Sequence, residues 1–159
     1  MTTRAMKTRR IVVSEFIEEV AAAARLAADA RGVTLHVAPV EAGVAIDADP
    51  QVLSAVVANL LQNAFKFTHP ASTVTLRVGA GPDRLLIEVE DECGGLPGAG
   101  ASAPSSSFEQ RGADRSGLGV GLAFSRWGVE ASGGRLYSRN LPGTGCVFTV
   151  DLPRSPTPV

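Results

Sequence analysis

The sequence is poor in the residues that build metal clusters and disulfide frameworks. It contains only two cysteines, Cys93 and Cys146, without Cys-x-x-Cys spacing, and only two histidines, His36 and His69. These counts argue against a cysteine–histidine metal cluster and against a disulfide-stabilised fold. Two free thiols are typical of a reducing compartment, so we expect a cytoplasmic location.

A strong charge of one sign is also missing. The formal net charge is −1 and the sequence pI is about 6.1, so no overall positive field would attract nucleic acid. The chain has no run of the roughly 18 apolar residues that a membrane-spanning helix needs. The basic start, MTTRAMKTRR, is followed by acidic residues and a helical pattern instead of the apolar core of a signal peptide. We therefore expect neither nucleic-acid binding nor direct membrane contact of this chain.

Two common phosphate-binding motifs are absent too. No GxxxxGK[ST] stretch is present, which excludes a P-loop. The glycine run that starts at Gly117 has Leu122 where the dinucleotide-binding fingerprint needs a glycine, and no strand precedes it. Any phosphate site in this chain therefore belongs to another class.

The length and composition are those of one compact domain. The chain has 159 residues, of which 45% are hydrophobic, enough for a single core. We expect a basic lead over residues 1–10, the remnant of a longer upstream element, then the domain over 11–153 and a flexible tail over 154–159. Residues 94–117, rich in Gly, Ala, Ser and Pro, predict a long functional or mobile loop.

Hydrophobic periodicity predicts three helices and six strands. The first helix begins at Ser14. The second begins with Asp49 as N-cap and Pro50 as its first residue, and the third covers 118–131. The strands are predicted over 33–38, 44–47, 72–78, 84–91, 135–140 and 146–152. This order favours an α+β two-layer sandwich, in which a mixed, largely antiparallel sheet is covered on one face by about three helices. Trp127, in the last helix, is interpreted as a packing residue.

The helix after Pro50 carries an unusual polar ridge. At about 100° per residue, Asn59, Asn63 and Lys66 fall in one narrow arc at the edge of the apolar face. Asparagine prefers caps and turns to helix interiors, so two of them here need a reason. The ridge is either an ordinary polar rim or a site for a metal ion and phosphate. The apolar face comprises Val52, Leu53, Val56, Val57, Leu60, Leu61, Ala64 and Phe67.

Two further stretches suggest ligand binding. Alternation along 84–91 directs Asp91 towards the core, where a carboxylate needs a hydrogen-bond partner, such as the exocyclic amino group of a purine. The alternative is a strand that ends at Glu90 and a solvated Asp91. The second stretch, Gly117-Leu118-Gly119-Val120-Gly121-Leu122, opens a helix, and its backbone N–H groups could face an anion. By itself this stretch is a weak signal.

Taken together, these stretches resemble the ATP-binding domain of sensor histidine kinases, which shares a Bergerat-type fold with gyrase, Hsp90 and MutL. The resemblance extends from about Ile11 to Pro153. Residues 59–68 are similar to the family's asparagine box, 91–96 to its first glycine box and 117–122 to its second. Phe108-Glu109 resembles the phenylalanine box, inside an ATP lid over about 94–117, and 143–148 resembles the closing hairpin.

The resemblance implies ATP and Mg²⁺ as cofactors and a role for each matching residue. Asn63 would ligate Mg²⁺, Lys66 would contact phosphate, Asp91 would bind the adenine amino group, and Asn59, Asn63 and Lys66 would be the catalytic residues. The implied nucleotide-binding residues are Asn59, Asn63, Lys66, Phe67, Asp91, Gly95, Leu96, Phe108, Arg111, Gly117, Leu118, Gly119, Gly121 and Leu122. Arg111 and Arg115 could reach the γ-phosphate, or they are solvated lid charges.

Three departures bear on the reaction. The family usually has Asn-Gly after the aspartate, whereas Glu92-Cys93 stands here, which affects the turn and the fit around the base. Neither histidine is followed by the family's phosphoacceptor pattern, so the acceptor would lie in another domain or protein. Asn59 occupies the position of the glutamate that activates water in ATP-hydrolysing relatives. Because Asn59 cannot be a general base, the resemblance favours phosphoryl transfer over hydrolysis.

The implied function is therefore that of the catalytic domain of a two-component sensor histidine kinase. Its partners would be a histidine-bearing dimerisation domain and a response regulator, and residues 1–10 would be the end of the dimerisation helix or a linker. The isolated domain is expected to be a monomer, and a full-length parent could be anchored in a membrane. The alternatives are a serine kinase of the anti-sigma-factor type and a non-catalytic module that senses ATP or docks a partner.

Overall fold

The structure is a computed structural model that describes residues 6–69, 71–92, 118–143 and 145–155. Its helices are α1 (Val13–Ala30), α2 (Pro50–Phe67) and α4 (Leu118–Ala131). Its strands are β1 (Arg9–Val12), β2 (Thr34–Val37), β3 (Ala45–Ala48), β4 (Thr73–Ala80), β5 (Arg84–Glu90), β6 (Arg135–Leu141) and β7 (Gly145–Pro153). The bounds of the predicted elements agree with these to within three residues, and β1 is the one strand that the periodicity did not predict.

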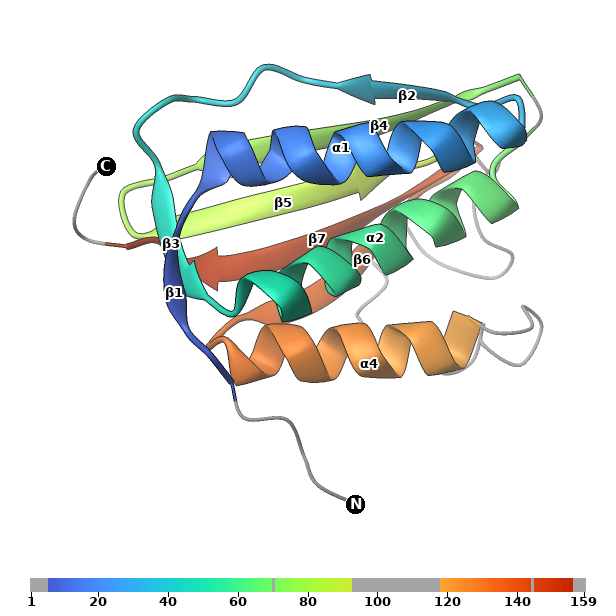
Figure 1. Cartoon of the computed structure of the whole chain (residues 1–159). Helices are drawn as coiled ribbons and strands as arrows, with labels where there is room; N and C mark the ends of the chain where they lie inside the picture. Colours follow the sequence, from blue (N-terminus) through green and yellow to red (C-terminus); the bar gives the residue numbers. More distant parts are fainter. Residues whose placement is uncertain (1–5, 70, 93–117, 144, 156–159) are drawn as a thin grey trace.

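The strands form one large sheet and one small one. The large sheet has the order β2-β4-β5-β7-β6, and only the β2–β4 pair is parallel. In Figure 1, α1, α2 and α4 lie side by side across one face of this sheet, with α2 between the other two. The predicted two-layer α+β sandwich with a largely antiparallel sheet is therefore confirmed. In the part of the chain that the structure describes, no helix has the combined length and apolarity that a membrane crossing requires.

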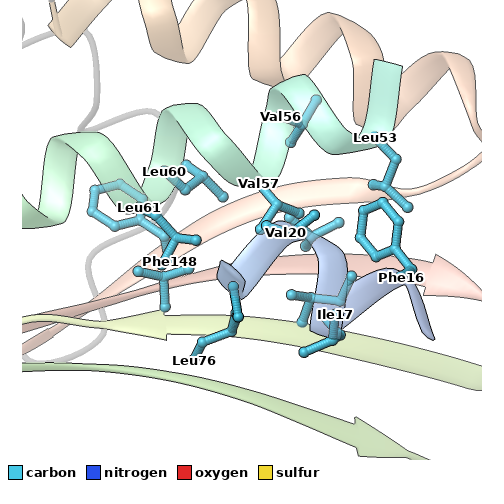
Figure 2. Close-up of a cluster of buried hydrophobic side chains, with 14 of the residues drawn as sticks. Phe16, Ile17, Val20, Leu53, Val56, Val57, Leu60, Leu61, Leu76 and Phe148 are labelled. Carbon is cyan, nitrogen blue, oxygen red and sulfur yellow. The ribbon is translucent and has the colours of Figure 1, made fainter. Parts of the chain in front are cut away.

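The core lies between the helices and the sheet, with α2 at its centre (Figure 2). Leu60 and Leu61 of α2 are almost completely buried, as are Ile17 of α1 and Leu76 of β4. The apolar face predicted for α2 is confirmed except at its end, where Phe65 is 2% exposed and Phe67 is only partly buried. The helix ends after Phe67, so this side chain lies at the border of the core.

The first strand that the structure describes lies partly within the basic lead. Arg9 and Arg10 belong to β1, which pairs antiparallel with β3 to form the small sheet. The main-chain N of Lys7 donates to Asp49 Oδ2 at 2.9 Å, while Asp49 Oδ1 accepts from the N–H groups of the first turn of α2. The predicted boundary at residue 11 thus lies inside β1. Asp49 both caps α2 and binds the main chain of Lys7, just before β1.

The sheet face opposite the helices carries a network of charged side chains. Arg77 donates to Glu88 at 3.0 Å and to Glu90 at 2.7 Å, and Glu90 is the strongest of the interactions that raise the pKa of Arg77. On β6, at the edge of the same sheet, burial is the main cause that raises the pKa of Tyr137, and the charge of Asp151 on β7 acts in the same direction. This face is therefore polar and internally paired, as expected for a sheet covered on one side only.

Candidate functional site

The asparagine ridge lies along the edge of α2, where the sequence predicts it. Asn59 and Asn63 are half-buried and Lys66 is exposed. The ammonium of Lys66 lies 5.3 Å from the ring centroid of Phe67, a distance typical of a cation–π contact. Asp49 caps this helix at its N-terminus and Pro50 is its first residue.

Asn63 faces the first turns of α4. A Cβ atom placed on Gly121 would lie 3.7 Å from Asn63 Nδ2, so glycine leaves space beside this amide. Leu122, the next residue, is 3% exposed and belongs to the core. Further along α4, a Cβ on Gly128 would lie 2.9 Å from side-chain atoms of both Val52 and Val56. The glycines of α4 thus bring its backbone close to α2.

Asp91 is buried at the end of β5. It is 2% exposed, its main-chain N donates to the carbonyl of Cys146 at 3.0 Å, and its Oδ1 accepts from the N–H of Cys146 at 3.0 Å. The strand ends at Glu90, but Asp91 is a core-side residue, so the solvated-turn alternative is wrong. A buried carboxylate needs such partners because it loses the solvation of water.

Gly145 is a site residue whose role was not recognised from the sequence, although the Gly-Thr-Gly hairpin had been singled out. A Cβ at this position would lie 1.9 Å from the carbonyl oxygen of Asp91 and 2.9 Å from Asp91 Oδ1. Only glycine allows β7 to pass this close to the carboxylate. The glycine-rich turn could be seen in the sequence, but its proximity to Asp91 could not.

Several predicted residues lie outside the part of the chain that the structure describes, namely Gly95, Leu96, Phe108, Arg111, Arg115 and Gly117, together with Cys93. Leu118 and Gly119 form the beginning of α4. The structure therefore brings together the residues predicted on α2, on β5 and at the start of α4, and the roles predicted for the lid stay predictions.

Trp127 corrects one expectation. It was interpreted as a packing residue, but 42% of it is exposed, and its ring centroid lies 5.8 Å from that of Phe124, which is 37% exposed. The small residues Gly121 and Gly128 form the side of α4 that meets α2. Trp127 therefore lies towards the outside of the helix.

A separate depression lies on the other side of α2. It has a volume of about 450 Å³, is bounded by the ends of α1 and α2, and is lined by Ala27, Ala30, Arg31, Gln62, Asn63, Phe65 and Lys66. α1 and α4 flank α2 on opposite sides (Figure 1). Asn63, which lines the depression, also lies beside Gly121 of α4. Arg31 and Lys66 are the basic residues of this lining.

Three chemically different groups meet at one end of the sheet. The C-terminal part of α2, the end of β5 and the N-terminus of α4 all lie at that end in Figure 1. They supply amide groups and an ammonium, a buried carboxylate, and the partial positive charge of a helix N-terminus. Such a set can accept a hydrogen bond from an amine at one point and attract a polyanion at another.

Comparisons with known proteins agree with this arrangement. Residues 48–156 match the family described as histidine kinase-, DNA gyrase B- and HSP90-like ATPase. The circadian input-output histidine kinase CikA of Synechococcus elongatus is 38% identical over 112 residues, which are 67% of this chain and 15% of CikA. The signal transduction histidine-protein kinase AfsQ2 of Streptomyces coelicolor is 33% identical over 121 residues, 74% of this chain and 22% of AfsQ2. The chain thus spans less than a quarter of the length of these relatives.

Solved structures show the same fold at lower identity. The catalytic domain of the histidine kinase ThkA superposes with a TM-score of 0.79 at 20% identity, covering 95% of this chain and 98% of that domain. The mycobacterial sensor histidine kinase MprB gives a TM-score of 0.74 at 22% identity, covering 95% of this chain and 100% of the MprB chain. The resemblance seen in the asparagine ridge and the Asp91 turn is confirmed, and the chain belongs to the histidine kinase-, DNA gyrase B- and HSP90-like ATPase family.

Proposed function

We propose that this chain is the ATP- and Mg²⁺-binding catalytic domain of a two-component sensor histidine kinase. It would donate the γ-phosphoryl group of ATP to a histidine on a separate domain or protein. The observation that carries the proposal is the buried carboxylate of Asp91, at the same end of the sheet as the asparagine ridge of α2 and the N-terminus of α4.

Asp91 would select adenine. Its Oδ1 is held by the N–H of Cys146, which orients the carboxylate, and its burial excludes competing water. An exocyclic amino group that donates to this carboxylate would form a charge-assisted hydrogen bond. The close approach of Gly145 keeps the strand backbone, not a side chain, beside the carboxylate.

The residues on α2 fit a magnesium–triphosphate group. Mg²⁺ is bound by one or two protein oxygens together with phosphate oxygens and water, and Asn63 carries one amide oxygen on a side chain that lies beside the first turns of α4. Asn63 would hold the ion, which would neutralise phosphate charge when bound. Lys66, exposed at the crest of the helix, would contact a phosphate oxygen, and the N-terminus of α4 would add its partial positive charge.

Asn59 bears on whether the phosphoryl group goes to water or to a protein. A carboxamide cannot accept a proton from water as a carboxylate can, so this position offers no base for hydrolysis. The contribution of the chain is then positioning and charge stabilisation, which is the usual way in which proteins assist phosphoryl transfer. A protein nucleophile would receive the phosphoryl group.

Further partners follow from this function. Because neither histidine has the phosphoacceptor pattern, the acceptor would be on a histidine-bearing dimerisation domain in the same or another chain, and a response regulator would act downstream. We place the domain in the cytoplasm and expect it to be a monomer in isolation.

The test is to incubate the domain with labelled ATP, Mg²⁺ and a histidine-bearing dimerisation domain, and to treat the labelled product with acid. Acid-labile label on the acceptor supports the proposal. Acid-stable label would indicate a serine kinase, and no label would indicate a binding module. Asn63→Ala should abolish labelling of the acceptor. Gln62 is the exposed neighbour of Asn63 on the same turn, and Gln62→Ala should leave the labelling intact. Equal labelling by the two variants would contradict the role of Asn63.

A further inference from the structure

Glu92 makes three contacts with the connection between α2 and β4. Its main-chain N donates to Thr68 Oγ1 at 3.0 Å, and its carbonyl accepts from the N–H of His69 at 3.3 Å. Its carboxylate accepts a short hydrogen bond from the N–H of Thr73. One residue thus holds the beginning and the end of this connection.

The carboxylate of Glu92 takes the place of a strand partner. Thr75 is paired with Glu90 in the β4–β5 ladder, so an extension of this antiparallel register puts Thr73 opposite Glu92. The ladder ends at Thr75 and Glu90, and the side chain of Glu92 satisfies the N–H of Thr73 instead of a backbone carbonyl. A hydrogen bond to a carboxylate is charge-assisted and is generally stronger than one between two neutral backbone groups.

The two ends that Glu92 joins carry different parts of the site. Thr68 is the C-cap of α2 and its N–H donates to the carbonyl of Ala64, within the turns that carry Asn63 and Lys66. Glu92 itself directly follows Asp91. The contacts of Glu92 therefore connect the last turn of the ridge helix to the residue next to the buried carboxylate.

We propose that Glu92 is a positioning residue that sets the spacing between the adenine-binding end of the site, at Asp91, and its phosphate-binding end, at Asn63 and Lys66. This inference rests on the proposed function. Its consequence is specific: without the Glu92 carboxylate each end still exists, but a ligand that must reach both ends binds less well. A ligand that uses only the adenine end is affected less.

The experiment compares the affinities of Mg-ATP and adenosine by calorimetry in three variants. Glu92→Ala removes the acceptor, Glu92→Gln keeps an oxygen that can accept from Thr73, and Glu90→Ala removes a carboxylate of the same strand that is bonded to Arg77 on the outer face. We expect Glu92→Ala to weaken Mg-ATP binding about tenfold, which corresponds to the loss of one charge-assisted hydrogen bond. Adenosine binding should weaken less than about threefold. Glu92→Gln and Glu90→Ala should stay within about threefold of the unmodified chain for both ligands.

Hydrogen exchange of the Thr73 amide in the nucleotide-free chain provides an independent measurement. Its protection should be lost in Glu92→Ala and retained in Glu92→Gln. If Glu92→Ala does not fold, Thr68→Val replaces it, since valine preserves the shape of threonine but removes the oxygen that accepts from the N–H of Glu92 and contacts the hydroxyl of Ser72. The same selective loss of Mg-ATP affinity is expected there.

The outcomes separate the two proposals. If the unmodified chain binds neither adenosine nor Mg-ATP, the proposed function is wrong and the role of Glu92 in it falls as well. If the unmodified chain binds both ligands, three results would each overturn the Glu92 proposal alone: unchanged Mg-ATP affinity in Glu92→Ala, an equal loss for both ligands, or unchanged protection of Thr73.

Discussion

Gly145 and Asp91 approach each other so closely that a side chain cannot stand between them. A Cβ on Gly145 would lie 1.9 Å from the carbonyl oxygen of Asp91 and 2.7 Å from its carbonyl carbon. Both contacts are to backbone, which cannot rotate away as the end of a long side chain can. The position of the buried carboxylate therefore depends on a glycine that lies 54 residues later in the chain.

Gly145→Ala should strongly destabilise the chain. The added methyl group requires a shift of β5 or β7. Overpacking costs about 1–3 kcal/mol, and a contact with backbone belongs at the upper end of that range. Denaturant unfolding measures the change. Gly79→Ala is the control, because a Cβ there meets nothing within 4 Å, and we expect its effect to stay within about 0.5 kcal/mol. Similar stabilities of the two variants would contradict the close approach.

Asp91→Asn should lower ATP affinity while the fold is kept. The remaining oxygen can still accept from the N–H of Cys146, but the charge that would attract the adenine amino group is removed. A charged hydrogen bond is worth roughly 1.5–3 kcal/mol, or about 10- to 150-fold in affinity. Calorimetric titration with ATP measures this, and circular dichroism checks the fold. An unchanged affinity in a folded variant would refute the role of Asp91.

Gly128→Ala should weaken the packing of α4 on α2. Alanine usually stabilises a helix interior by about 1 kcal/mol relative to glycine, but here the new Cβ would meet Val52 and Val56 at 2.9 Å. We expect a net loss of about 1–2 kcal/mol in unfolding free energy. Combination with Val56→Ala should recover part of this loss, because the shortened side chain makes room. Strict additivity of the two substitutions would show that the contact does not limit the approach of the helices.

Tyr137 should titrate above its ordinary pKa. Burial is the main cause and the charge of Asp151 adds to it, although Arg135 acts in the opposite direction. Since the folded-state pKa is raised, the stabilising contribution is complete below the unfolded pKa of about 10 and is lost as pH rises through the folded pKa. Stability should therefore fall at alkaline pH, and Tyr137→Phe should reduce that fall.

The measurement is direct because Tyr137 is the one tyrosine in the sequence. The absorbance of tyrosinate follows its ionisation without interference from another phenol. Asp151→Asn should move the midpoint back towards the ordinary value. A midpoint at or below about 10 in the folded chain would contradict the expected direction.

Much of the architecture could be predicted from local sequence. Apolar periodicity located α2 and its buried face, the Asp49-Pro50 pair marked where that helix begins, and strand alternation directed Asp91 towards the core. These features depend on residues close together in the chain, because helix and strand geometry assign each residue to a face. The asparagine ridge was visible for the same reason.

Other features depend on which distant segments meet, and no local period records that. The pairing of β1 with β3 extended the fold into the basic lead, and Trp127 lies outward because the small residues of α4 form its contact with α2. The constraint on Gly145 and the contacts of Glu92 with Thr68 and Thr73 exist only once β5 lies beside β4 and β7. The sequence by itself determined the elements and the chemistry that they carry, whereas the tertiary structure decided their spacing, because close packing of backbone against backbone is a property of pairs of segments and not of either one.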